Sequence, residues 1–198
     1  VTAERTALNF LQLLSGTATT VNTYVQAIAG TKTHVVDSRK TIPGLRLAQK
    51  YAVRVGGGAN HRVGLYDGIL IKENHIATAG GVTAALKDAY AIVAAPDVAA
   101  RPEAPFIQIE VERLDQLTEA LQAGAKMVLL DNMTHEQIAE AVRINRDQFN
   151  GQAVLEVSGN VSLDNIRSYA ELGVDRISSG SLTKHIRATD YSMRVNAV

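Results

Sequence analysis

Six short runs of mostly apolar residues recur along this 198-residue chain, and segments with helical periodicity separate them. The runs cover residues 34–38, 68–72, 106–111, 126–131, 153–158 and 174–178. They are nearly continuous in Val, Ile and Leu, which is typical of strands buried on both faces of a parallel sheet. Successive runs begin roughly 20–38 residues apart, a spacing that suits right-handed strand–helix–strand crossovers. We therefore predict an α/β fold built on one parallel sheet.

Polar residues stand at or next to the carboxyl end of every run. These residues are Asp37, Ser38, Lys72, Glu110, Asp131, Ser158 and Ser178. In a parallel barrel the strand ends converge on one rim, where the active sites of that fold lie. A doubly wound open sheet is the main alternative, but polar groups at every strand end favour a shared polar site. Because six runs fall short of the eight strands of a closed barrel, we predict an incomplete, open α/β barrel of about six to seven parallel strands.

Local signals predict where several helices and loops lie. Apolar spacing predicts a first helix over residues 2–29, with a break or kink at Ser15-Gly16. Residues 134–137 (THEQ) fit a capping box at the start of a later helix. Residues 94–105 contain three of the four prolines and are expected to form a surface connection. We expect residues 1–198 to form a single domain.

The charge of the chain is balanced overall and uneven along its length. Lys plus Arg and Asp plus Glu both number 20, which argues against nucleic acid or a membrane surface as the partner. Residues 32–75, however, hold eight cationic and three acidic residues, so an anionic small molecule is the expected ligand. The absence of Cys excludes thiolate chemistry, and no run is long enough to span a membrane. We expect a cytoplasmic protein, and the start at Val1 suggests a piece of a longer chain.

Cationic residues stand at three places on the predicted rim. Arg39 and Lys40 follow the first run, and His61 and Arg62 follow three consecutive glycines that allow a close backbone approach. Arg can grip an anion through two hydrogen bonds. Lys72 ends an apolar run, where it fits either a Schiff-base lysine or a lysine that pairs with a substrate anion. The basic surroundings favour the second reading.

Glu110 and Asp131 end consecutive strands and are expected to be neighbours. Such a pair can serve as acid and base, hold Mg²⁺ through water, or bind sugar hydroxyls. The alternative is a structural ion pair with Lys72 or Arg62. The turns at Ser158-Gly159 and at Ser179-Gly180-Ser181 match the phosphate-binding position of such barrels.

Five segments together resemble the quinolinate phosphoribosyltransferases, in particular the bacterial type. They are DSRKTIPGLR (37–46), GGGANHR (56–62), LIKENH (70–75), LDN (130–132) and EVSGN (156–160). The resemblance runs in order through essentially the whole chain. It implies a type II phosphoribosyltransferase barrel that converts quinolinate and phosphoribosyl pyrophosphate to nicotinate mononucleotide, pyrophosphate and CO₂ in NAD biosynthesis.

The resemblance also implies roles for individual residues. The quinolinate carboxylates would meet Arg5, Arg39, His61, Arg62 and Lys72. Lys40 would lie near the pyrophosphate, and Glu110 and Asp131 would handle the ribose hydroxyls and Mg²⁺. Ser158, Gly159 and Gly180 would surround the 5′-phosphate. The family's chemistry needs no organic cofactor.

Two features depart from the family pattern. The family's amino-terminal α/β sandwich domain is not in these residues, and in the family's homodimer that domain covers the partner's barrel, while the residue matching Arg5 enters the neighbouring site. We therefore expect the 198 residues alone to bind quinolinate poorly. Val157 stands where many relatives have Ser, a change expected to matter little.

Three alternatives remain open at this point. They are a related protein of the same fold with another acceptor, such as the molybdenum-transport-associated relative, a catalytically inactive barrel, and a Schiff-base aldolase acting through Lys72.

Overall fold

Six parallel strands form one curved sheet in the computed structural model, which describes residues 2–194. The strands are β1 (His34–Val36), β2 (Gly68–Ile71), β3 (Phe106–Val111), β4 (Met127–Asp131), β5 (Val154–Ser158) and β6 (Arg176–Ser178). Their order in the sheet is β1-β6-β5-β4-β3-β2, and every pairing is parallel. Each predicted run therefore contains a strand, and the predicted parallel sheet is confirmed.

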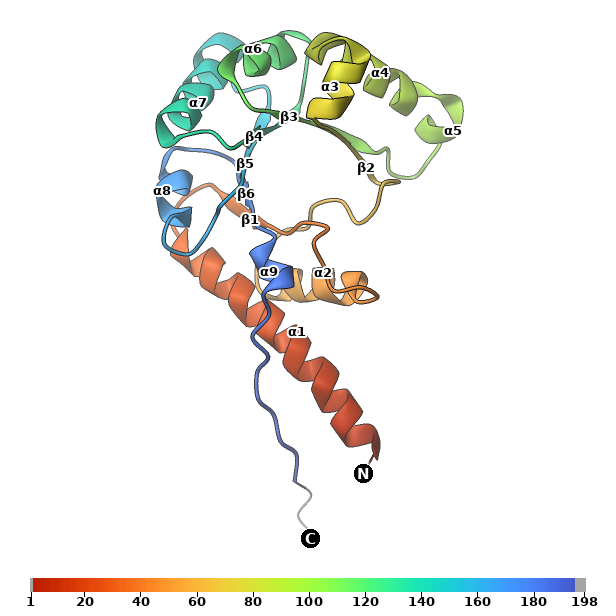
Figure 1. The fold of residues 1–198 in the computed structure, drawn as a ribbon, viewed down its shortest axis with the longest axis vertical. Helices are drawn as coiled ribbons and strands as arrows, with labels where there is room; N and C mark the ends of the chain where they lie inside the picture. Colours follow the sequence, from red (N-terminus) through yellow and green to blue (C-terminus); the bar gives the residue numbers. More distant parts are fainter. Residues whose placement is uncertain (1, 195–198) are drawn as a thin grey trace.

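Helices surround this curved sheet, most of them on its outer face (Figure 1). They are α1 (Thr2–Ala27), α2 (Arg46–Val55), α3 (Glu73–Ala79), α4 (Val82–Ala94), α5 (Pro96–Ala99), α6 (Leu114–Gln122), α7 (His135–Phe149), α8 (Ile166–Glu171) and α9 (Ser181–Lys184). The capping box at the start of α7 is confirmed, since Thr134 and Gln137 exchange side-chain and backbone hydrogen bonds. The proline-rich connection is mostly exposed, as predicted for a surface connection, and it contains one short helix, α5. Within residues 2–194, none of the helices is both long enough and apolar enough to cross a membrane.

Alternate residues of the central strands face two different environments. Ile109, Val128 and Leu155 are buried in the apolar core that the sheet shares with the helices. Residues one position away in sequence point to the other face, because successive side chains alternate along a strand. On β3 and β5 these are the polar pairs Gln108–Glu110 and Glu156–Ser158. The outer face of the sheet thus forms the core, while the inner face carries polar groups.

The barrel is open between the two edge strands, β1 and β2. In the part of the chain that the structure describes, these strands are the ends of the sheet and do not pair with each other. The connection 56–67 lies between them: Ala59 bridges to Val36 of β1, and Arg62 Nη1 donates to the Gly68 carbonyl of β2 at 2.9 Å. The predicted open barrel is confirmed, and a loop occupies the seam.

Two of the three glycines at the start of this connection are explained by packing, and Gly57 between them has a φ of +90°. A Cβ on Gly58 would lie 2.8 Å from a methyl group of Val21 and 3.0 Å from one of Val53. A Cβ on Gly56 would collide with the Ala18 carbonyl of α1. The close approach expected at these glycines is therefore made to α1 and α2.

Gly58→Ala should destabilise the protein by about 1–3 kcal/mol, the usual cost of overpacking a filled core. Urea unfolding of the wild type and the variant measures this loss. Combining Gly58→Ala with Val21→Ala should cost less than the sum of the single changes, because the shortened side chain makes room for the new methyl group. Additive losses would contradict the packing explanation.

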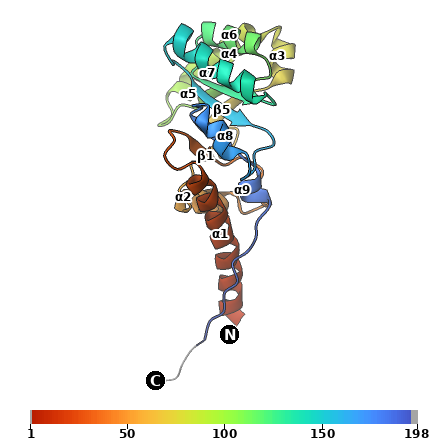
Figure 2. The same cartoon turned by 90° about the vertical axis from the view of Figure 1, so that its left-hand side faces the viewer.

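Helix α1 runs unbroken through Ser15-Gly16, so the predicted break there is wrong. Gly16 meets a different need, because a Cβ at this position would collide with the Arg187 carbonyl. The carboxyl-terminal segment crosses α1 at this point, and Thr189 N donates to the Gln12 carbonyl at 3.0 Å. Figure 2 shows the segment running beside the helix. Gly16 therefore allows two backbones to approach closely.

Candidate active site

A cleft with two lobes opens at the carboxyl ends of the strands. The basic lobe, about 330 Å³, is lined by Asp37, Ser38, Arg39, Lys40, His61, Arg62, Leu70, Lys72, Glu110, Leu129, Glu156, Ser158, Ser178 and Gly180. The serine-glycine lobe, about 520 Å³, is lined by Lys40, Lys72, Glu110, Asp131, Ser158, Gly159, Asn160, Val161, Ser178, Ser179, Gly180, Ser181, Lys184 and His185. Lys40, Lys72 and Glu110 line both lobes. The two lobes are therefore parts of one continuous cleft.

The structure brings ten of the eleven predicted site residues to this cleft. They are Arg39, Lys40, His61, Arg62, Lys72, Glu110, Asp131, Ser158, Gly159 and Gly180. Arg5 is exposed near the amino end of α1, which projects away from the sheet (Figure 1).

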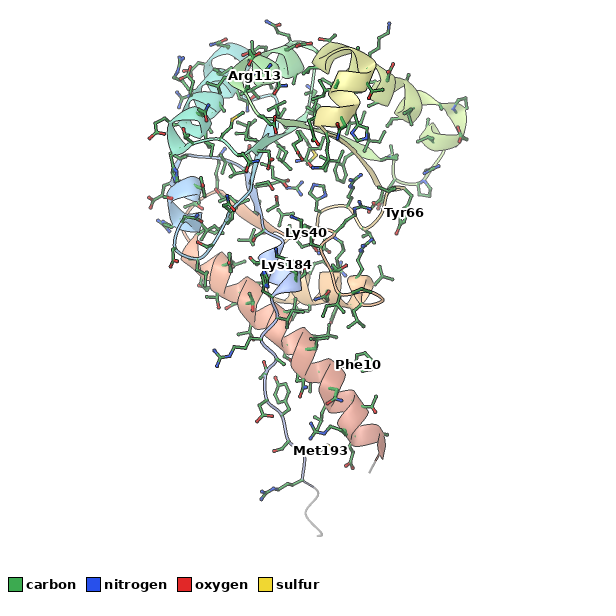
Figure 3. All side chains as sticks on the ribbon, viewed as in Figure 1. Phe10, Lys40, Tyr66, Arg113, Lys184 and Met193 are labelled. Atoms are coloured by element: carbon green, nitrogen blue, oxygen red, sulfur yellow. The ribbon has the colours of Figure 1, made fainter. Side chains whose placement is uncertain are left out.

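Lys184 and His185 also line the serine-glycine lobe and were not among the predicted site residues. Figure 3 shows Lys40 and Lys184 on the same side of the open barrel, where α9 lies. The position of Lys184 and His185 just after the Gly180 turn was the available signal.

A buried ion pair anchors the basic lobe from below. Lys50 Nζ of α2 lies 2.7 Å from Asp37 Oδ1, and both side chains are almost fully buried, at 4% and 0% exposure. Asp37 also accepts hydrogen bonds from His61 N and Asn60 Nδ2, each at 2.7 Å. Burial raises the pKa of Asp37, against the opposing effect of Lys50. Asp37 and Lys50 therefore hold the loop that carries His61 and Arg62.

Two arginines form part of the wall of the basic lobe. Arg39 and Arg62 both line it, and burial, followed by the nearby charge of Arg39, lowers the pKa of the Arg62 guanidinium. Arg46 instead braces the loop, because it donates to Thr41 Oγ1 and to the carbonyls of Val63 and Arg39. Two close arginines in a half-buried lobe favour a ligand with negative charge.

Glu110 is paired with Lys72 in this structure. The Lys72 Nζ lies 2.8 Å from Glu110 Oε2 and 3.0 Å from Oε1. Burial raises the pKa of Glu110; Lys72 acts against this shift, and the charge of Asp131 adds to it. The structural ion pair that the sequence left open is thus present, but it lies on the cleft between the lobes. A ligand anion that takes Lys72 would release the Glu110 carboxylate.

The serine-glycine lobe is built from two tight turns. Gly159 has φ +93° and Asn160 has φ 47°, so the chain after β5 turns in the left-handed region. A Cβ on Gly159 would lie 3.0 Å from Asn132 Oδ1. A Cβ on Gly180 would lie 2.7 Å from Lys40 Cδ. Glycine at both positions keeps the lobe open and lets Lys40 lie against the turn after β6.

A polar layer below the rim was missed by the sequence analysis. Gln108 and Glu156 are fully buried, and Gln108 Nε2 donates to Glu156 Oε2 at 3.1 Å. Arg176 Nε lies 3.1 Å from the same carboxylate oxygen. The available signal was the period of two along each strand, since Gln108 and Glu156 precede Glu110 and Ser158 by two positions.

Comparison with known proteins places this chain in a family. The family model described as "Quinolinate phosphoribosyl transferase, C-terminal domain" matches residues 17–194. The chain belongs to this family. The nicotinate-nucleotide pyrophosphorylase [carboxylating] of Mycobacterium leprae is 45% identical over 193 residues, which are 98% of this chain and 64% of the relative. The probable nicotinate-nucleotide pyrophosphorylase [carboxylating] of Bacillus subtilis is 38% identical, over 98% of this chain and 63% of the relative.

Solved structures of the family agree with this fold. The nicotinate-nucleotide pyrophosphorylase of Francisella tularensis superimposes with a TM-score of 0.85 at 51% identity, covering 94% of this chain and 62% of that chain. NadC of Streptococcus pyogenes gives a TM-score of 0.87 at 43% identity, covering 97% and 63%. The chain thus spans a little under two thirds of the length of these four family members.

Proposed function

We propose that this chain forms the barrel of a quinolinate phosphoribosyltransferase. The reaction would join quinolinate to phosphoribosyl pyrophosphate and yield nicotinate mononucleotide, pyrophosphate and CO₂. One observation supports this most strongly: the basic lobe and the serine-glycine lobe are continuous, with Glu110 and Lys72 where they meet. Such a cleft can hold an anionic ring and a phosphorylated sugar side by side.

The basic lobe fits a pyridine with two neighbouring carboxylates. Arg39 and Arg62 would each bind a carboxylate, and guanidinium groups suit this because they donate two parallel hydrogen bonds. Lys72 would turn from Glu110 to the substrate as the ring enters. Exchange of one carboxylate partner for another keeps the ammonium group neutralised, so the exchange carries little electrostatic cost.

The serine-glycine lobe fits the phosphoribosyl group. The turns at Ser158-Gly159 and Gly180 would surround the 5′-phosphate, and Lys40 would face the pyrophosphate. Loss of pyrophosphate leaves positive charge on the ribose, which the fixed carboxylates of Glu110 and Asp131 can stabilise. The pyridine nitrogen attacks the sugar carbon as pyrophosphate leaves. The positive ring nitrogen then stabilises the carbanion that departing CO₂ leaves on the neighbouring ring carbon, and a proton takes the place of the lost carboxylate.

The carboxylates also fit a magnesium ion carried with the pyrophosphate. Within residues 2–194 no group of three His, Asp or Glu side chains forms a ready-made metal site. Mg²⁺ commonly binds through one or two carboxylates together with substrate phosphates. Glu110 and Asp131, which line the same lobe, supply that number and type of ligand. The ion would neutralise the leaving pyrophosphate.

We further propose a cytoplasmic homodimer, or a larger homo-oligomer, in which Arg5 serves the neighbouring subunit's site. The support is the placement of Arg5, exposed on α1 and away from the cleft of its own chain.

Release of labelled CO₂ tests the proposed reaction. The complete natural polypeptide that carries these residues is incubated with carboxyl-labelled quinolinate, with and without phosphoribosyl pyrophosphate and Mg²⁺. Label should be released only when phosphoribosyl pyrophosphate and Mg²⁺ are both present. Nicotinate should not be converted to a nucleotide in place of quinolinate. Turnover of another acceptor alone would favour the related protein of the same fold, and no turnover of any acceptor would favour an inactive barrel. Borohydride trapping of Lys72 by a carbonyl compound would favour the aldolase.

A further inference from the structure

Both ring nitrogens of His61 are engaged inside the protein. The Arg62 backbone N–H donates to His61 Nδ1 at 2.8 Å. Because a backbone amide can only donate, Nδ1 must carry no proton, and the neutral ring must carry its proton on Nε2. Nε2 lies 2.6 Å from Gln108 Oε1. The contacts at Nδ1 and Nε2 therefore select one neutral tautomer of His61.

The partner of His61 is in turn oriented by a buried carboxylate. Gln108 Nε2 donates to Glu156 Oε2, so the amide must present its oxygen to His61. Glu156 Oε1 is buried without a hydrogen-bond partner in the described residues, and it lies 3.9 Å from His61 Nε2. A second acceptor thus faces the same ring nitrogen. Reversing the Gln108 amide would place its NH₂ group against the His61 proton and its oxygen against a carboxylate.

We propose that Glu156 and Gln108 are positioning residues that hold His61 as the neutral Nε2–H tautomer and thereby hold Arg62 in the wall of the basic lobe. The ring accepts from the Arg62 backbone, and the Arg62 guanidinium is tied to the Gly68 carbonyl of β2. A ring that rotated or gained a proton on Nδ1 would repel the Arg62 amide. The expected effect on quinolinate binding rests on the proposed function, whereas the expected tautomer of the His61 ring does not.

The charges around His61 are consistent with a neutral ring. Glu156 of β5 faces it with negative charge, and Arg176 of β6 and Arg62 of the seam loop face it with positive charge. Phe106 of β3 packs against the ring at 5.5 Å between centroids, in an edge-on arrangement. Burial lowers the pKa of His61, and Glu156 opposes this shift. The carboxylate therefore orients the ring through Gln108, while burial keeps the ring uncharged.

Nitrogen-15 NMR of the histidine ring tests the proposal in the ligand-free protein. The five histidines are labelled, and His61→Asn assigns the signal of this ring. At pH 7.5 the wild type should show a bare Nδ1 and a protonated Nε2. Glu156→Gln should populate the other tautomer, because either amide can then turn over. The exchanged pair Gln108→Glu with Glu156→Gln should restore the Nε2–H form, since a carboxylate at position 108 accepts from the ring directly.

Steady-state kinetics test the consequence for Arg62. Glu156→Gln should raise the quinolinate KM about tenfold, as expected when a hydrogen bond to a charged group is weakened, and should change kcat less than the KM. The exchanged pair should recover most of the loss. Glu119→Gln is the matched control, because Glu119 caps Thr83 on the outer surface and lies outside the cleft.

Three results would overturn the proposal. They are a protonated Nδ1 in the wild type, an unchanged tautomer in Glu156→Gln, and a changed tautomer with an unchanged quinolinate KM. If the complete wild-type polypeptide fails to turn over quinolinate, the proposed function is wrong, and the ring signals of the wild type and the exchanged pair still decide the positioning claim. Because the wild-type measurement needs only the His61→Asn assignment and not Glu156→Gln, poor folding of Glu156→Gln leaves the proposal testable.

Discussion

Glu110→Gln should reduce the rate of nucleotide formation from quinolinate and phosphoribosyl pyrophosphate by about a hundredfold or more, the scale of losing one fixed charge-stabilising group in an enclosed site. Gln keeps the shape of the side chain but carries no charge to oppose the positive ribose. The quinolinate KM should not rise, because Lys72 loses its competing partner and becomes free for the substrate. Initial rates at varied quinolinate separate kcat from KM.

The control for this prediction is Glu119→Gln, the same exchange on the outer surface, which should retain the wild-type rate. A Glu110→Gln variant within about threefold of the wild-type kcat would show that Glu110 is no more than the structural partner of Lys72. A rise in quinolinate KM without a fall in kcat would point to the same conclusion.

Lys50→Met should lower the free energy of unfolding by about 3–5 kcal/mol, because it leaves the Asp37 carboxylate buried without its charged partner. Lys50 and Asp37 are 4% and 0% exposed, so solvent cannot replace the lost ammonium group. The Asp37 hydrogen bonds to Asn60 and His61 offset only part of this loss. Urea unfolding at pH 8 measures the difference.

The deficit of Lys50→Met should shrink as the pH falls. Burial already raises the pKa of Asp37 above its unfolded value, and removal of Lys50 raises it further. A carboxyl group with a raised folded pKa adds stability at low pH and loses that contribution as the pH rises through the folded pKa. The variant should therefore approach the wild type between pH 8 and pH 5.

The control here is Lys32→Met, which removes the ion pair of Lys32 with Asp175 at 2.6 Å. Their side chains are 60% and 32% exposed, and an exposed pair of this kind contributes about 0–1 kcal/mol. Equal losses for the two Lys→Met variants, or a deficit for Lys50→Met that grows at low pH, would contradict the role of burial.

The strands could be predicted because burial on two faces leaves a mark in the sequence. Runs such as 106–111 and 126–131 have few polar residues, and glycine or proline stands near their ends. The candidate site followed from the same feature, since Glu110 and Asp131 interrupt apolar strands at the rim. Strand position alone was enough to bring these residues to one cleft.

Other features depend on side-chain direction or on contacts between distant segments. The sequence alone places Asp37 at a strand end and counts Lys50 only in the charge of residues 32–75, whereas the fold pairs the two side chains and buries both. A break was expected at Gly16 because the sequence does not show that the chain returns to cross α1 near Arg187. Gln108 and Glu156 needed the register of three strands before they could be joined to His61. Short-range patterns do not contain such pairings.

The seam between β1 and β2 has a consequence for how this enzyme family can diversify. His61 and Arg62 lie on the connection 56–67, whereas Ser158 ends a central strand and Gly180 lies two residues beyond the end of β6. Under the proposed function, exchanging that one segment would change which acid is accepted and leave the turns at Ser158 and Gly180 in place. Swapping it between relatives is therefore a direct route to altered acceptor preference.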